Sequence, residues 1–209
     1  LTDNGLKHVP KLQTLYCNNN FTDDGLKHLS QLQTLYGNAN LTDDGLQHVP
    51  NLQTLSCDCN RKFTNDGLKH VPQLKTLDCG DNDNFTNNGL RHVPSLQTLR
   101  CNCNKNITDD GLKHVPSLQT LKFDFKNFTD DGLKHVPQLK QLSCDIRGKL
   151  TDDGLKHVPQ LEILFCNDKF TNDGLKHVPQ LKKLYCCMNF NITRKGLKHV
   201  PRLEEFHRM

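Results

Sequence analysis

Residues 21–40 read FTDDGLKHLSQLQTLYGNAN, and residues 41–60 read LTDDGLQHVPNLQTLSCDCN. The same pattern returns every 20 to 22 residues along all 209 positions, so ten copies of one unit make up the chain. A fixed period of this length indicates a stack of small structural units rather than one globular core. Function is therefore to be sought where the copies differ.

The spacing of apolar residues predicts one strand and one short helical turn in each copy. Leu15 and Cys17 alternate as on a strand, whereas Leu26 and Leu29 lie three apart, as on one face of a helix. The Thr-Asp-Asp before each helical turn supplies an N-cap and acids for the positive end of the turn. Proline ends the turn in nine copies, because it cannot donate to a continuing helix.

Each copy carries Leu-x-x-Leu-x-Cys-x-x-Asn, as at Leu12, Leu15, Cys17 and Asn20, and the whole chain follows this pattern closely. The pattern resembles that of the leucine-rich repeat family, L-x-x-L-x-L-x-x-N/C-x-L. Its T-D-x-G-L variant is similar to bacterial repeat arrays and to the cysteine-containing repeats of F-box-type receptors. The resemblance implies an α/β solenoid shaped like a horseshoe, with a parallel β-sheet on the concave face and short helical turns on the convex face.

We expect residues 1–209 to form a single domain of ten repeats, the first and last partial or capping, with nine complete strands and a partial tenth. A solenoid needs only a narrow core, which suits a hydrophobic content of 34% and the absence of tryptophan. No apolar run approaches the ~20 residues of a membrane span, and no charged-then-apolar leader opens the chain. Since Leu1 falls inside the repeat, we expect a fragment or a processed product of a soluble protein.

Most cysteines occupy the inward strand position that leucine fills in the family. Free cysteine packs as a small hydrophobe, so we expect these thiols to be buried and reduced. One inward column supplies the four converging ligands of a zinc site poorly, and we predict no metal site and no cofactor. Strands ~4.8 Å apart bring such thiols close to disulfide range, so a reduced column favours a cytoplasmic or otherwise reducing compartment. The column comprises Cys17, Cys57, Cys79, Cys101, Cys144, Cys166 and Cys186, and the outward positions hold Cys59, Cys103 and Cys187.

The convex segment repeats a lysine and a histidine in nearly every copy, as at Lys113 and His114. The helix-start aspartates largely offset this basic stripe, which explains a net charge of only +4. The stripe has no interleaved aromatic residues, so we expect no nucleic-acid partner. No acid or cysteine accompanies the histidines to complete a metal site.

Asparagines near the end of each repeat are expected to hold the turn backbone by hydrogen bonds, as the family resemblance implies. They are Asn20, Asn40, Asn60, Asn82, Asn104 and Asn189, and we expect looser or differently bonded turns at Lys126, Arg147 and Lys169, where the pattern breaks. Six Asn-x-Thr sequons arise from the same repeat pattern, so they do not by themselves indicate secretion.

Side chains on the concave sheet face vary from copy to copy, unlike the convex segment. Diverse residues on rigid strands can recognise one shaped partner, and apolar and aromatic groups concentrate in the sixth to ninth copies, as they do at interface centres. We predict a partner-binding face made by Tyr16, Tyr36, Arg100, Lys122, Phe125, Ile146, Ile163, Phe165, Tyr185 and Met188.

The sequence therefore indicates a protein-protein interaction module whose concave face binds a protein partner. It does not indicate an enzyme, because no nucleophile with a positioned base, phosphate-binding glycine loop or separate acid pair stands out from the repeat pattern. Two alternatives stay open. The chain is the substrate-recognition part of a ubiquitin ligase receptor, or it is a structural spacer without a specific ligand. Its oligomeric state is not indicated.

Overall fold

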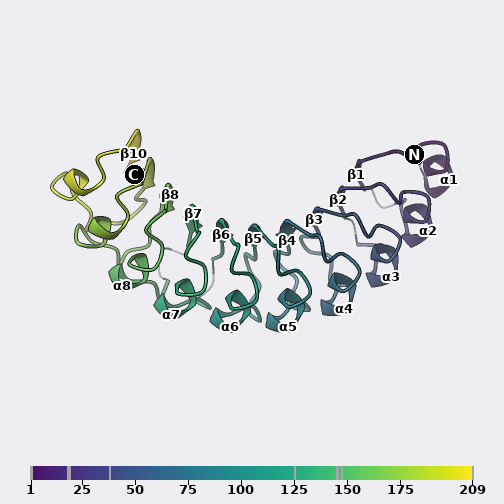
Figure 1. The fold of residues 1–209 in the computed structure, drawn as a ribbon, viewed down its shortest axis with the longest axis horizontal. Helices are drawn as coiled ribbons and strands as arrows, with labels where there is room; N and C mark the ends of the chain where they lie inside the picture. The colour runs from purple at the N-terminus through teal and green to yellow at the C-terminus, as the bar shows by residue number, and fades with distance from the viewer. Residues whose placement is uncertain are drawn as a thin grey trace.

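The fold is a curved solenoid, seen here in a computed structural model that describes residues 2–17, 20–37, 39–124, 126–144, 146 and 148–208. Strands line the inner side of the arc and helical turns line the outer side, with the two termini at opposite ends (Figure 1). We number the repeats by the strand that each contains. None of the helices in the described ranges has the length and apolar character that a membrane span requires.

Ten strands form one parallel sheet in sequence order within the described residues. The tenth strand is as long as the others and pairs fully with the ninth, so the expectation of a partial tenth strand was wrong. The strands are β1 (Thr14–Tyr16), β2 (Thr34–Tyr36), β3 (Thr54–Ser56), β4 (Thr76–Asp78), β5 (Thr98–Arg100), β6 (Thr120–Lys122), β7 (Gln141–Ser143), β8 (Ile163–Phe165), β9 (Lys183–Tyr185) and β10 (Glu205–His207).

One helical turn per repeat lies on the convex side, as expected. In most repeats the threonine before the turn accepts a hydrogen bond from a backbone N–H two residues on, as Thr64 does from Asp66 at 3.1 Å. The turns are α1 (Asp3–Leu6), α2 (Asp23–Leu26), α3 (Asp43–Leu46), α4 (Asn65–Leu68), α5 (Asn87–Leu90), α6 (Asp109–Leu112), α7 (Asp130–Leu133), α8 (Asp152–Leu155) and two 3-10 turns, η1 (Gly174–His177) and η2 (Leu197–His199).

Equivalent residues of successive repeats lie side by side, so the core is a set of parallel columns. The central strand leucines pair in register, as Leu15 does with Leu35, and Leu15 and Leu55 are both buried, as predicted. The residue that opens each repeat adds a second buried column, which includes Phe63 and Phe85. Because each repeat covers the apolar edge of its neighbour, the core extends along the whole solenoid.

A second set of contacts joins the repeats on the convex side. The first acid of each Asp-Asp pair accepts two hydrogen bonds from the threonine that begins the next helical turn. Asp130 accepts from the Thr151 backbone N–H at 2.8 Å and from its hydroxyl at 2.6 Å. Where asparagine replaces the aspartate, as at Asn65, its amide nitrogen donates to the Thr86 hydroxyl and its oxygen still accepts the backbone N–H. We call this the Asp/Asn–Thr ladder.

The ladder explains the glycine of the Thr-Asp-x-Gly motif. In the second to tenth repeats this glycine faces the ladder residue of the preceding repeat, which is an asparagine for the fifth, sixth and tenth repeats and an aspartate for the others. A Cβ atom on Gly25 would lie 2.5 Å from a carboxylate oxygen of Asp3, well inside van der Waals contact. Glycine is therefore required by close approach and not by a positive φ angle, since no glycine in the described residues has one.

The ladder predicts unequal roles for the two acids of one repeat. Asp130→Ala removes two hydrogen bonds to Thr151 and should lower the free energy of unfolding by about 2 kcal/mol. Asp130→Asn should cost much less, because Asn65 already makes the equivalent bonds. Asp131→Ala, at an exposed acid, should change the free energy by under ~0.5 kcal/mol. Urea denaturation followed by circular dichroism measures all three, and equal effects of the two alanine variants would contradict the ladder.

Candidate partner-binding face

The third residue of every strand points to the concave side, and the register places these residues in one row. Tyr16 lies beside Tyr36, and Arg100 lies beside Lys122. At the other end, the row continues through Phe165, Tyr185 and His207. The structure therefore brings together, in strand order, most of the residues that the sequence predicts for this face.

Three rings form a continuous stack over β8, β9 and β10. The Phe165 and Tyr185 rings lie 4.4 Å apart with an interplanar angle of 8°, and Tyr185 and His207 lie 5.1 Å apart at 3°. Stacking covers both faces of the Tyr185 ring and one face of the Phe165 ring, and both residues are half-buried. His207 extends the cluster by one repeat, which the sequence analysis did not include.

Aliphatic residues border this stack. Ile163 is the first residue of β8 and is half-buried on the same face, and Ile146 is half-buried in the loop after β7. Met188 follows β9 and is 65% exposed. The predicted residue Phe125 lies outside the described residues. The aromatic stack and its aliphatic border are here called the C-terminal concave patch, and they comprise Ile146, Ile163, Phe165, Tyr185, Met188 and His207.

Phe190 is an exposed aromatic residue that the sequence analysis missed. Its side chain is 75% exposed, and the Arg208 guanidinium lies 5.7 Å from the ring centroid. The sequence could have indicated this exposure, because Phe190 follows Asn189 at a position where other repeats carry a charged residue, such as Arg61 or Lys105. It places a second large apolar group close in sequence to Met188.

Glu205, Lys183 and Tyr185 form a hydrogen-bonded group beside the aromatic stack. Glu205 accepts from the Lys183 ammonium at 2.5 Å and from the Tyr185 hydroxyl at 3.0 Å. These bonds lower the pKa of Glu205, and in return they raise the pKa of Lys183 and of Tyr185. The tyrosine ring is thus held from its face by stacking and from its hydroxyl by a carboxylate.

The rest of the concave row is a charged centre and a second aromatic pair. Tyr16 and Tyr36 stack at 4.3 Å, and Tyr16 is 69% exposed. Between the two aromatic ends, Asp78 lies 3.8 Å from Arg100. Burial raises the pKa of Asp78, and Arg100 opposes that rise. Lys122 is exposed beside Arg100.

The inward cysteine column is confirmed for six of its seven members. Cys57, Cys79, Cys101, Cys144, Cys166 and Cys186 are buried free thiols. Cys17 is only half-buried, contrary to expectation, because a neighbouring repeat packs on one side of it alone. Burial nevertheless raises the pKa of Cys17 to about 12. The Sγ atoms of Cys166 and Cys186 lie 3.3 Å apart.

Two outward thiols lie among carboxylates. The Cys59 Sγ atom is 3.9 Å from oxygens of both Asp58 and Asp81, and these three exposed side chains form a group that could offer ligands to a cation. The Cys103 Sγ atom is 3.4 Å from an Asp124 oxygen, and this hydrogen bond raises the pKa of Cys103 to about 11. Asp58 likewise raises the pKa of Cys59. The neighbouring carboxylates thus favour the protonated, less reactive form of both thiols.

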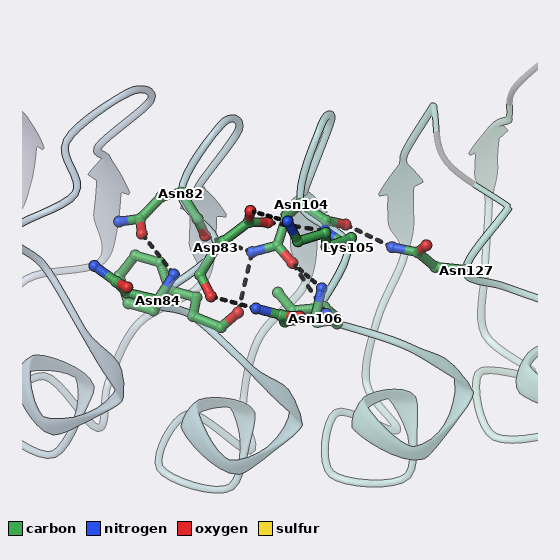
Figure 2. Close-up of polar contacts among 9 residues, drawn as sticks. Asn82, Asp83, Asn84, Asn104, Lys105, Asn106 and Asn127 are labelled. Atoms are coloured by element: carbon green, nitrogen blue, oxygen red, sulfur yellow. Dashed lines mark hydrogen bonds and ion pairs between the residues drawn. The ribbon is translucent and has the colours of Figure 1, made fainter.

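Asparagines form two rows along the edge of the sheet, which Figure 2 shows for the central repeats. In the inner row, buried Asn104 donates to the Asn82 carbonyl at 2.6 Å and accepts from the Asn106 and Ile107 backbone N–H groups. In the outer row, the sequon residue Asn106 donates to the Asp83 carbonyl at 2.6 Å. Equivalent outer bonds are made by Asn84, Asn127 and Asn191. In these four repeats the sequon amide thus bonds to the preceding repeat.

The turns at Lys126 and Lys169 are differently bonded, which is one of the two outcomes expected there. In the eighth repeat, buried Asn167 takes the inner role: it donates to the Leu150 carbonyl at 2.7 Å and accepts from the Lys169 and Phe170 N–H groups. In the sixth repeat, Asn127 donates to the Asn104 carbonyl at 2.5 Å. Arg147 lies outside the described residues. Asn20 and Asn40, two of the asparagines expected to hold the turn backbone, are exposed.

The residue before the inner asparagine takes a left-handed backbone conformation in four repeats. The φ angles are 61° at Cys59, 52° at Asp81, 55° at Cys103 and 57° at Met188. Residues other than glycine adopt this region at a cost in conformational free energy. The hydrogen bonds of the asparagine that follows offset this cost. This bend directs the side chain at this position away from the core, and it accounts for the exposure of Met188.

The convex stripe of lysines is neutralised by an aspartate in six repeats. The second acid of the helical turn binds the lysine three residues later, as Asp153 binds Lys156. The same pair occurs at Lys27, Lys69, Lys113, Lys134 and Lys176. The histidine column is exposed or half-buried on this side, as predicted.

No protein-family model matches the sequence, and no curated protein sequence matches it. Solved structures do match. Internalin InlF of Listeria monocytogenes aligns over 96% of this chain and 62% of its own, with 19% identity and a TM-score of 0.64. The functional domain of InlJ from the same organism, which includes a cysteine ladder, aligns over 98% and 50%, with 25% identity and a TM-score of 0.63. A chain of the Toll–Spatzle complex of Drosophila aligns over 97% and 33%, with 14% identity and a TM-score of 0.67.

The parallel sheet, the helical turn in each repeat and these likenesses define the chain as a leucine-rich repeat protein with the α/β horseshoe fold. It spans 62% of the length of InlF and smaller shares of the other two chains. The sequence resemblance to the leucine-rich repeat family is confirmed.

The burial pattern predicts which thiols react in the native protein. A maleimide reagent should modify Cys59, Cys103 and Cys187 first, Cys17 more slowly, and the six buried column thiols only after unfolding. Peptide mass spectrometry at successive times, with and without urea, measures the order. Rapid modification of Cys79 or Cys101 without urea would contradict the burial of the column.

The carboxylate beside Cys103 should control its reactivity. Asp124→Asn keeps an acceptor oxygen for the Cys103 backbone N–H but removes the charge, so the pKa of the thiol should fall and its thiolate fraction at pH 8 should rise. We expect alkylation of Cys103 by iodoacetamide to accelerate several-fold. Cys59 in the same sample is the control, because its pKa is raised by Asp58 and Asp81. An unchanged Cys103 rate would show that Asp124 does not hold the proton.

Proposed function

We propose that the chain is a protein-interaction module and that the C-terminal concave patch is its recognition site. The observation that carries the proposal is the continuous stack of Phe165, Tyr185 and His207 on adjacent strands. Aromatic side chains are enriched among the residues that dominate binding energy at protein interfaces. A partner's apolar side chain would contact the exposed ring edges and the neighbouring Met188.

The stack suits this role because its side chains are already ordered. Binding usually costs side-chain entropy at the interface, roughly 0.5–1.5 kcal/mol for each rotamer-rich side chain that becomes fixed. The Tyr185 ring is held by two stacked neighbours and by the hydrogen bond to Glu205. Much of that entropy is therefore lost on folding and need not be lost again on binding.

The contrast between the two faces supports the concave side as the place of recognition. On the convex side, six repeats present the same exposed Lys–Asp pair. On the concave side, the equivalent positions run from tyrosine through aspartate, arginine and lysine to phenylalanine. A uniform surface cannot distinguish one irregular partner from another, whereas the concave row can.

The structural neighbours are consistent with a binding role, since one of them is a chain of the Toll–Spatzle complex. A substrate-recognition role in a ubiquitin ligase receptor is a narrower form of the same proposal, and it shares the same site. A structural spacer would need no such patch. We also propose a reducing compartment, because Cys166 and Cys186 are free thiols at 3.3 Å and would be prone to oxidation elsewhere.

The proposal predicts that the aromatic residues anchor the partner. Phe165→Ala and Tyr185→Ala should each weaken binding of the partner recovered by pull-down at least roughly tenfold, because truncating an anchor typically costs ~2 kcal/mol or more. Neither change should unfold the protein, since both side chains lie outside the buried core. Affinity is measured by isothermal titration and folding by circular dichroism.

Lys113→Ala and His114→Ala on the convex side are the controls and should change the affinity little. If the convex pair abolished binding and the aromatic pair did not, the concave assignment would be wrong. If no partner bound the folded chain with measurable affinity, the spacer alternative would replace the proposal.

A further inference from the structure

The tenth repeat reverses the charge pattern of the convex side. Other repeats carry acids or asparagines after the threonine, whereas this repeat reads Thr193-Arg194-Lys195-Gly196-Leu197-Lys198. Arg194 stands at the position of the Asp/Asn–Thr ladder, and Lys195 stands where an acid pairs with lysine in six other repeats. A basic side chain therefore replaces each of the two usual acids.

These cations have no counter-charge in the structure. Arg194, Lys195 and Lys198 are all exposed, and no ion pair joins any of them to an acid within the described part of the chain. They lie within five successive residues, and the 3-10 hydrogen bonds of this segment, such as that from the Leu197 N–H to the Arg194 carbonyl, place residues three apart on one side, so Lys195 and Lys198 leave the same side of the turn. Lys198 lacks the acid that Lys176 has in the repeat before.

Among the described residues, no acid of a neighbouring element is paired with these cations either. The ladder residue that faces this turn from the ninth repeat is Asn172, which is neutral and bonds to Thr193. Asp173 is held by Lys176. Glu205 is bonded to Lys183 and Tyr185 on the concave side. The cluster thus keeps its positive charge.

The charge of the whole chain is concentrated at this end. Residues 192–209 contain five basic residues and only two acidic ones, although the net charge of the 209 residues is only +4. Arg202 is exposed next to Pro201, and Arg208 lies over the exposed ring of Phe190. A partner that reached this end would meet unpaired cations beside exposed apolar surface.

We propose that the Arg194–Lys195–Lys198 turn is a second interaction surface that binds an acidic segment of a protein partner. Its charge complements carboxylates, and arginine and lysine together offer donors for more than one of them. The surface is separate from the concave patch and does not depend on the function proposed there. A single turn with three cations matches a short acidic stretch of polypeptide better than a nucleic acid, which is usually met by a longer basic stripe. In this chain six lysines of the longer stripe are paired with aspartates.

The test compares two double variants that remove the same charge. Arg194→Gln with Lys195→Gln deletes two cations of the proposed surface, and Lys134→Gln with Lys156→Gln deletes two paired cations from other convex repeats. A fluorescein-labelled deca-glutamate peptide is the probe, and fluorescence anisotropy at 50 mM and 300 mM salt is the measurement. We expect the wild-type chain to bind the peptide, the first double variant to bind at least tenfold more weakly, and the second to bind within twofold of wild type.

A third variant guards against loss of folding. Arg194→Asp with Lys195→Asp restores the Thr-Asp-Asp-Gly sequence of five other repeats, so it should fold at least as well as the wild type by circular dichroism. It should bind the peptide most weakly of all. Equal losses in both glutamine variants would show that only net charge matters and would overturn the proposal. Tighter binding of a decathymidylate, lost with the same substitutions, would overturn it in favour of a nucleic-acid surface, and absence of binding at 50 mM salt would overturn it outright.

Discussion

The hydrogen bonds between successive repeats are the constraint on which the rest of the structure depends. Successive repeats are tied together on two sides of the core, by asparagine amides at the sheet edge (Figure 2) and by the Asp/Asn–Thr ladder on the convex side. Buried carbonyl and N–H groups must find partners, and Asn104 satisfies four of them from one side chain. The strands of successive repeats therefore pair in register, at the regular spacing of a parallel sheet.

That regular spacing determines what the concave face can present. Strands in a parallel sheet lie ~4.8 Å apart, which is close to the stacking distance of aromatic rings. Phe165 and Tyr185, in register on adjacent strands, consequently stack at 4.4 Å, and Tyr16 and Tyr36 do the same at the other end. The strand spacing thus orders the rings in a stack that covers ring faces and leaves ring edges exposed. The same spacing brings the inward thiols of Cys166 and Cys186 together.

Residues on the convex surface of the solenoid stabilise the fold, whereas residues on the concave surface are available for recognition. Convex residues stabilise the stack: in most repeats one acid of the pair binds the next threonine, the other neutralises a lysine, and the glycine leaves room for the first acid. Concave residues are free of these duties and differ between repeats. Arg194 and Lys195 are the departure from this rule, because they occupy convex positions and perform neither duty.

The amino-acid sequence by itself determined the repeat, the strand and helical turn in each copy, the inward leucine and cysteine columns, and the concave row of variable residues. All of these follow from spacing within one copy, where the backbone period fixes which side chains share a face. The tertiary structure alone decided that Asp130 binds Thr151, that Asn167 replaces the asparagine missing at Lys169, and that Phe165 and Tyr185 are half-buried in a stack. These contacts join residues about twenty positions apart, so they depend on the rise and rotation between repeats, which the pattern within one repeat does not contain.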